Sequence, residues 1–128
     1  MVQSARLNLM KTHHISFKHA LDGITYCFKT QPNFRFHLFA TLLVTLAGYL
    51  LKLTVGEWLI LAFTIFLVLS SEMVNTALES MTDLLTSEYK LEAKIAKDVS
   101  AGMVLLSAFI ALIVAALIFL PHLSNLFS

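Results

Sequence analysis

The sequence predicts an all-α membrane protein with three transmembrane helices and an N-terminal amphipathic surface helix. Of its 128 residues, 58% are hydrophobic and only 13% are charged, and the mean hydropathy is +0.80. A soluble domain of this length could not bury so much apolar surface, because small domains leave a large share of their chain in water. The apolar residues also form long runs, and the run from Val99 to Leu120 contains no charged residue. We therefore expect a single membrane domain over residues 1–128.

The surface helix is expected at about residues 15–30. Apolar side chains recur there every three or four positions, among them Phe17, Leu21 and Ile24, and polar side chains fall mostly on the other side. Ser16 suits the N-cap position of such a helix. In a membrane protein, a helix with this pattern is expected to lie in the plane of the interface.

Three apolar segments are long enough, at about 1.5 Å per residue, to cross a hydrocarbon core of about 30 Å. Pro32 is expected to end the surface helix within a turn over residues 30–33. A second turn at residues 54–57 precedes Trp58, which begins the next segment at the interfacial depth that Trp favours. Pro121 is expected to end the last helix. The predicted spans are residues 34–53, 58–85 and 98–120.

The distribution of Lys and Arg predicts the orientation of the chain. Three spans place the N-terminus and the second loop on the same side, and of the nine Lys and Arg residues only Lys52 falls on the other side. By the positive-inside rule, the N-terminus and the second loop are cytoplasmic. There is no basic stripe with interleaved aromatic residues, so nucleic acid is not an expected partner. The cytoplasmic cations are Arg6, Lys11, Lys18, Lys29, Arg35, Lys90, Lys94 and Lys97.

The stretch SSEMVNTALESMTD at residues 70–83 places an acidic face on the second span. Glu72, Asn75, Glu79 and Asp83 fall within a sector of roughly 80° on a helix. Ionisable groups within a membrane segment indicate function, because isolated charge is costly there. Three roles are open: a hydrogen-bond network between helices, a path for protons or ions, and a catalytic site at the membrane surface. The acids occupy one leaflet only, which favours the catalytic site.

The loop after the second span supplies charges that complement this acidic face. Glu88, Lys94, Lys97 and Asp98 lie in the loop or in the first turns of the next helix. Lysine suits phosphate, and carboxylates bind Mg²⁺ through one or two oxygens, so these are the parts that phosphoryl transfer requires. The glycine-rich nucleotide motifs and the motifs of soluble protein kinases are absent from the sequence.

Two segments, EMVNTALESMTDLLTSEY and AKIAKDVSAGMVLLSA, closely resemble the small integral-membrane lipid kinases of bacteria. That family contains prokaryotic diacylglycerol kinase and undecaprenol kinase. The segment SFKHALDGITYCFKTQPNFRFHL resembles its N-terminal block, so the resemblance covers about residues 15–120. It implies a homotrimer in the bacterial inner membrane, with Mg²⁺ as cofactor and ATP as co-substrate. The active sites would lie between protomers at the cytoplasmic interface.

The resemblance also implies roles for individual residues. Glu72 corresponds to the catalytic base, which takes the proton from the lipid hydroxyl. Asn75 and Asp83 correspond to catalytic-site groups that order the site. The expected nucleotide contacts are Glu79, Glu88, Lys97, Asp98 and His19. The expected contacts of the lipid headgroup are Asn33, Arg35 and Glu72. Glu79 also corresponds to a metal ligand.

One position departs from the family pattern. Gln31 stands where the family usually has a second metal-binding glutamate. An amide oxygen can bind Mg²⁺ but brings no charge. The resemblance therefore predicts a metal site at Gln31 and Glu79 that is weaker than the family pattern, or that depends more on Glu79 and the phosphates of ATP.

The identity of the lipid follows from the block TQPNFRFHL, in which His37 follows Arg35. This block resembles the undecaprenol kinase branch, so undecaprenol is the expected acceptor and diacylglycerol is the alternative. An alternative of another class is a small membrane subunit without enzymatic activity that uses its acidic face for ion handling or assembly.

Overall fold

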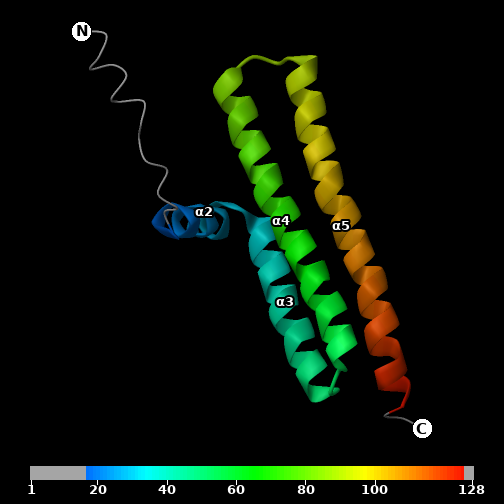
Figure 1. Ribbon diagram of the computed structural model, residues 1–128. Helices are drawn as coiled ribbons and strands as arrows, with labels where there is room; N and C mark the ends of the chain where they lie inside the picture. Colours follow the sequence, from blue (N-terminus) through cyan, green and yellow to red (C-terminus); the bar gives the residue numbers. More distant parts are fainter. Residues whose placement is uncertain (1–16, 126–128) are drawn as a thin grey trace, which may run out of the picture.

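The computed structural model describes residues 17–125, which are helical apart from short connections. The helices are α2 (Phe17–Thr30), α3 (Pro32–Leu50), α4 (Val55–Leu85) and α5 (Leu91–Ser124). In Figure 1, α4 and α5 lie side by side, α3 lies along the lower part of α4, and α2 runs across the direction of the other three. The predicted N-cap Ser16 lies outside the described residues.

Two of these helices, α4 and α5, are long and apolar enough to cross a membrane. The predicted first span at residues 34–53 is not confirmed, because α3 does not meet the same criterion. This helix has only 19 residues and begins with polar Asn33, Arg35 and His37, which lower its mean hydropathy. The interfacial position of α2 also stays a prediction, although α2 exposes large apolar side chains and buries only Cys27.

The connection between α2 and α3 is shorter than the predicted turn. Only Gln31 separates the two helices, and its backbone N–H donates to the carbonyl of Cys27 at 2.9 Å. Pro32 ends α2 as expected, but it also begins α3, because a proline at the first helical position loses no intrahelical hydrogen bond.

The turn between α3 and α4 lies earlier in the chain than predicted. Lys52 has a left-handed φ of 56°, and Thr54 is the N-cap of α4. The backbone N–H of Thr54 donates to the Glu57 carboxylate at 2.7 Å, and the N–H of Glu57 donates to Thr54 Oγ1 at 3.3 Å. This capping box makes residues 55–57 the first turn of α4, which corrects the predicted turn at residues 54–57.

Gly48 allows this turn to pack closely against the start of α4. A Cβ at Gly48 would lie 2.8 Å from Leu53 Cδ1 and 3.0 Å from the Trp58 ring. Contacts this short do not occur without displacement of the neighbours, so the close approach of Leu53 and Trp58 requires glycine here.

Helix α5 extends beyond the predicted span of residues 98–120 at both ends. Pro121 does not end it as expected, and the helix continues to Ser124. The proline lacks only its own N–H, so the helix loses the hydrogen bond to the carbonyl four residues earlier, while the carbonyl of Pro121 still accepts from Asn125 N–H at 3.2 Å. The long pairing of α4 with α5 is therefore preserved to the last turn.

Polar contacts join α4 and α5 at separate levels. The hydroxyl oxygens of Ser71 and Ser107 lie 2.8 Å apart near the middle, and His122 Nε2 lies 2.9 Å from Glu57 Oε1 at the end where α4 begins. A small apolar cluster fills that same end and consists of Leu53, Leu61 and Ile118.

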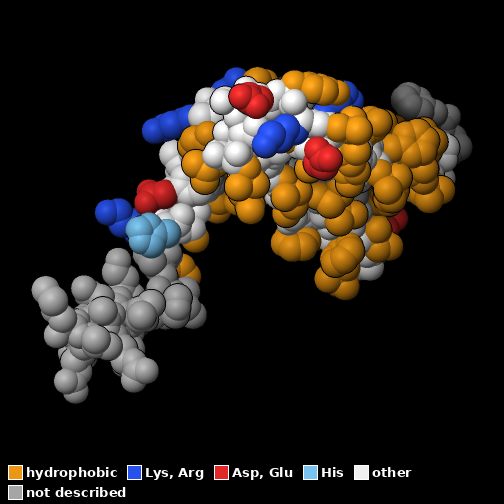
Figure 2. Space-filling view, turned by 90° about the horizontal axis from the view of Figure 1, so that it is seen from above, with side chains coloured by type: hydrophobic (Ala, Val, Ile, Leu, Met, Phe, Trp, Pro, Cys, Tyr) orange, Lys and Arg blue, Asp and Glu red, His pale blue; other side chains and the backbone are white. Residues whose placement is uncertain are grey.

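Most large apolar side chains stay exposed on a single chain. Figure 2 shows hydrophobic side chains over much of the flank, with charged side chains on the upper end of the molecule. An apolar surface of this extent requires a cover of lipid or of other protein subunits.

Candidate active site

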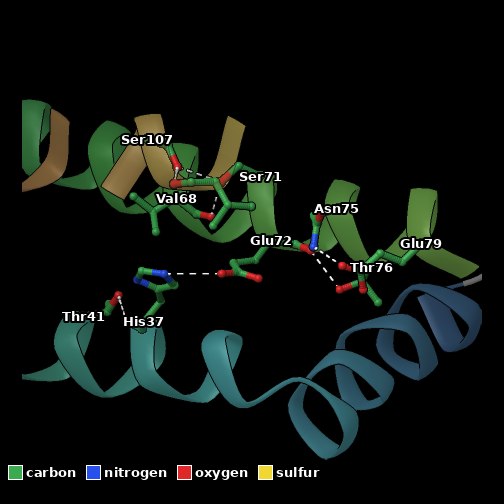
Figure 3. A network of polar contacts seen from close by, with 10 residues as sticks. His37, Thr41, Val68, Ser71, Glu72, Asn75, Thr76, Glu79 and Ser107 are labelled. Carbon is green, nitrogen blue, oxygen red and sulfur yellow. Dashed lines mark hydrogen bonds and ion pairs between the residues drawn. The ribbon is translucent and has the colours of Figure 1, made fainter. Parts of the chain in front are cut away.

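Glu72 is the most deeply buried carboxylate of the predicted acidic face. Its exposed fraction is 2%, and its side chain points from α4 toward α3, where His37 Nε2 lies 3.4 Å from Glu72 Oε1 (Figure 3). This distance is within ion-pair range, but Oε1 accepts no hydrogen bond within the described part of the chain. A buried carboxylate oxygen without a donor costs free energy, so the folded chain leaves the Glu72 carboxylate incompletely satisfied.

Asn75 and Glu79 form a hydrogen-bonded pair further along α4. Asn75 Nδ2 donates to Glu79 Oε1 at 3.0 Å, and Ser100 Oγ on α5 donates to Asn75 Oδ1 at 2.6 Å. These contacts orient the Glu79 carboxylate. They also join α4 to α5, as expected for a network that holds helices together. Asn75 therefore has a structural contact, whereas Glu72 retains an unsatisfied oxygen.

A polar pocket of about 410 Å³ lies where α4 and α5 are joined. It brings together four of the predicted site residues, Asp83, Glu88, Lys97 and Asp98. Lys97 forms an ion pair with Asp83 across the two helices, and Lys94 forms one with Asp98 along α5. All four partners are substantially exposed, and exposed ion pairs contribute little stability. The pairs can therefore rearrange around a charged ligand at small cost.

Arg35 fixes the corner between α2 and α3. Its guanidinium Nη1 donates to the backbone carbonyls of Phe28 and Lys29 at 3.3 and 3.1 Å. The last carbonyls of a helix lack intrahelical partners, so these bonds satisfy the C-terminus of α2. The predicted contact of Arg35 with a lipid headgroup stays a prediction.

Three other predicted site residues lie outside the polar pocket. His19 is exposed on α2, and its Nδ1 lies 3.9 Å from Asp22. Gln31 is half-buried between α2 and α3, and Asn33 is exposed in the first turn of α3. The roles of these residues at the nucleotide, the metal and the lipid stay predictions.

Within residues 17–125, no three His, Cys, Asp or Glu side chains come together as a metal site. Mg²⁺ in phosphoryl-transfer sites is usually bound by one or two carboxylates together with substrate phosphates. Glu79, oriented by Asn75, supplies one such carboxylate one helical turn from Asp83. The donor set therefore fits a Mg²⁺ that arrives with a nucleotide.

An apolar groove of about 330 Å³ lies between α3, α4 and α5 and extends to His37. Its two threonines do not offer hydroxyl protons to the groove. Thr41 Oγ1 donates to the carbonyl of His37 at 2.8 Å, and Thr64 Oγ1 donates to the carbonyl of Ile60 at 2.8 Å. The groove thus presents hydrocarbon along its length, and His37 is its ionisable lining residue.

The sequence interpretation did not include His37 or Ser100 among the site residues. His37 follows buried Phe34 by three positions and precedes Thr41 by four, so its spacing places it on the inner face of α3. That spacing could have identified it. Ser100 is buried on α5, but a lone serine in an apolar helix carries no comparable signal.

The comparison with known proteins decides the family. A model described as prokaryotic diacylglycerol kinase matches residues 18–119. The chain belongs to this family. A Synechocystis protein named diacylglycerol kinase is 46% identical over 113 residues, and a Bacillus subtilis protein named undecaprenol kinase is 43% identical over 108 residues. A Haemophilus influenzae protein named diacylglycerol kinase is 29% identical over 109 residues.

These matches cover most of the chain and different shares of the relatives. The chain spans 65% of the Synechocystis protein and 88% of each of the other two, while 84–88% of the chain itself is aligned. The family and the names of the relatives indicate a lipid kinase, which argues against a subunit without enzymatic activity. The names differ on the acceptor lipid.

Proposed function

We propose that the protein transfers the γ-phosphoryl group of ATP to the hydroxyl of undecaprenol. The observation that carries this proposal is the buried, incompletely satisfied Glu72 carboxylate beside His37, at which the apolar groove ends. A lipid alcohol with its chain in the groove would bring its hydroxyl to this end. Glu72 would then contact the terminal hydroxyl, which is the only polar group of an isoprenoid alcohol.

The chemistry of the groove supports an isoprenoid alcohol over diacylglycerol. Diacylglycerol carries ester carbonyls close to its hydroxyl, and these need hydrogen-bond donors when they leave water. Thr41 and Thr64 use their hydroxyl protons on their own helices. An isoprenoid chain is hydrocarbon up to its terminal hydroxyl and makes no such demand. The Synechocystis relative keeps diacylglycerol as the second candidate.

The polar pocket at the α4–α5 junction is the proposed nucleotide site. Asp83 follows Glu72 by eleven residues, which corresponds to about 16 Å along the helix, and Glu79 lies between them. A triphosphate extending along α4 from this pocket would pass Glu79 on the way to Glu72. Lys97 would exchange its contact with Asp83 for a phosphate oxygen.

In the proposed step, the lipid oxygen attacks the γ-phosphorus and forms the new P–O bond. The bond from the γ-phosphorus to the β–γ bridging oxygen breaks, and ADP leaves with that electron pair. The hydroxyl proton passes to the Glu72 carboxylate. When bound with ATP at Glu79, Mg²⁺ supplies positive charge that neutralises the phosphates. Asn75 holds Glu79 in place through its hydrogen bond.

The proposal includes a homotrimer in the bacterial inner membrane, with the active site on the cytoplasmic side. The exposed apolar side chains of α3, α4 and α5 support contacts with lipid and with other subunits. The distribution of Lys and Arg supports the orientation. Because the pocket and the groove are both open surfaces on one chain, a neighbouring subunit can complete them.

The test is lipid-dependent ADP formation by the purified protein in bilayers containing undecaprenol, with Mg·ATP in the water phase. We expect undecaprenyl phosphate by mass spectrometry, and we expect Glu72→Gln to abolish it. Glu57→Gln is the matched control, because Glu57 is a carboxylate that also contacts a histidine, but at the other end of α4. Near-normal turnover by Glu72→Gln would show that Glu72 is not the base.

A further inference from the structure

We infer that His37 is a positioning residue that holds one oxygen of the Glu72 carboxylate, so that the other oxygen faces the acceptor hydroxyl. This inference rests on the proposed function. It assigns a role to a residue on α3 that acts through the base on α4. Three observations carry it: the contact itself, the lack of any other donor to that oxygen, and the place of His37 in the groove.

The contact joins two inward-facing side chains. Glu72 and His37 are 2% and 16% exposed at the side chain, and Nε2 lies 3.4 Å from Oε1. This separation exceeds the usual 2.7–3.2 Å of an N–H···O hydrogen bond by a few tenths of an ångström. Hydrogen bonds within active sites are often long in the absence of substrate and shorten in the reactive complex. A small rotation of the imidazole would close this one.

No other group in the described residues donates to Glu72 Oε1. The neighbouring polar side chains on α4 are already engaged: Thr76 donates to the carbonyl of Glu72, and Asn75 donates to Glu79. Without His37, the Glu72 carboxylate would have no hydrogen bond or ion pair among residues 17–125 to fix its rotation about the terminal bond. A misplaced base transfers a proton less efficiently, because reaction rates depend steeply on the alignment of the reacting atoms.

His37 also lines the groove, so one residue marks the end of the hydrocarbon path and contacts the base. Its backbone carbonyl accepts from Thr41, and the Phe36 ring lies edge-on to the imidazole at 5.6 Å between centroids. The contact with the Phe36 ring limits the movement of the imidazole. His37 therefore has two effects: it limits how far a lipid hydroxyl can enter, and it orients the carboxylate of Glu72.

The experiment compares three substitutions at residue 37 by steady-state kinetics with undecaprenol and Mg·ATP. The amide nitrogen of His37→Gln reaches roughly the position of Nε2, whereas that of His37→Asn reaches only the position of Nδ1. We expect His37→Ala and His37→Asn to lower kcat by about 10- to 100-fold, with the KM for ATP unchanged. His37→Gln should recover most of the lost turnover.

The matched control is His122→Ala, which removes a second histidine–glutamate contact, 2.9 Å long, from the opposite end of α4. Its kcat should stay close to that of the wild type.

Wild-type kcat in His37→Ala, or equal loss in the Gln and Asn variants, would overturn this inference and leave the proposed function intact. If His37→Ala does not fold, the comparison of the Gln and Asn variants decides. A wild-type protein that phosphorylates no lipid alcohol would overturn the proposed function, and the inference with it.

Discussion

Replacement of Glu72 by Gln should stabilise the fold while it removes activity. The side chain is 2% exposed, and Oε1 accepts no hydrogen bond. Leaving a buried acceptor unsatisfied costs about 1–3 kcal/mol, and more when the group is charged. Gln keeps the shape of the side chain, removes the charge, and replaces one oxygen by an N–H donor that can bind Nε2 of a neutral His37. The free energy of unfolding should therefore rise by roughly 1–3 kcal/mol.

The assay is thermal or denaturant unfolding of both proteins in the same detergent at neutral pH. Glu79→Gln is the matched comparison, because Glu79 accepts a hydrogen bond from Asn75 and its charge is already compensated in part. That variant should be no more stable than the wild type. A lower stability of Glu72→Gln would refute the reasoning, since it would mean that His37 already satisfies the carboxylate in the resting protein. Gain of stability with loss of function is the usual sign of an active-site residue.

Three further predictions concern the metal, the turn and the nucleotide. Gln31→Glu should lower the Mg²⁺ concentration that gives half-maximal activity in a titration of initial rates, because a carboxylate adds negative charge. Gly48→Ala should lower the free energy of unfolding by about 1–3 kcal/mol, because the new methyl group would lie 3.0 Å from Trp58. Lys97→Ala should raise the KM for ATP about tenfold and leave the KM for lipid unchanged, which corresponds to about 1.4 kcal/mol of lost binding.

Each of these has its own control. An unchanged Mg²⁺ titration would show that Gln31 is not at the metal. Gly56→Ala is the comparison for Gly48→Ala, because nothing lies within 4 Å of a Cβ at Gly56 and this variant should not lose stability. Lys18→Ala removes an exposed lysine from α2. An equal rise in the KM for ATP in that variant would argue for a general effect of charge rather than a contact at Lys97.

The sequence predicted the long helices and the polar face of α4 because both are properties of a single periodic segment. Asn75 and Glu79 form a hydrogen bond one helical turn apart, because side chains four residues apart are neighbours on a helix. The helix ends were predicted less well. They depend on local chemistry, such as the capping box at Thr54 and the entry of Pro32 directly into α3.

Contacts between helices could not be predicted from the spacing along one helix. The pairing of Lys97 with Asp83 and the approach of His37 to Glu72 depend on the relative height of two helices. The sequence pattern of one helix does not determine how far it is shifted along its axis relative to another helix. The sequence therefore identified Lys97 as a candidate nucleotide contact and Asp83 separately as a candidate catalytic-site group. It placed His37 only in a motif that resembles one branch of the family. Their partners became evident only in the folded chain.

The central claim is that a hydrocarbon alcohol held in the apolar groove is phosphorylated on its hydroxyl, and that Glu72 takes the hydroxyl proton. The most direct measurement is a competition in one bilayer that contains undecaprenol and diacylglycerol at equal mole fractions, with limiting Mg·ATP and both products quantified over time. The account predicts that undecaprenyl phosphate accumulates first and in excess. Faster formation of phosphatidic acid would contradict it.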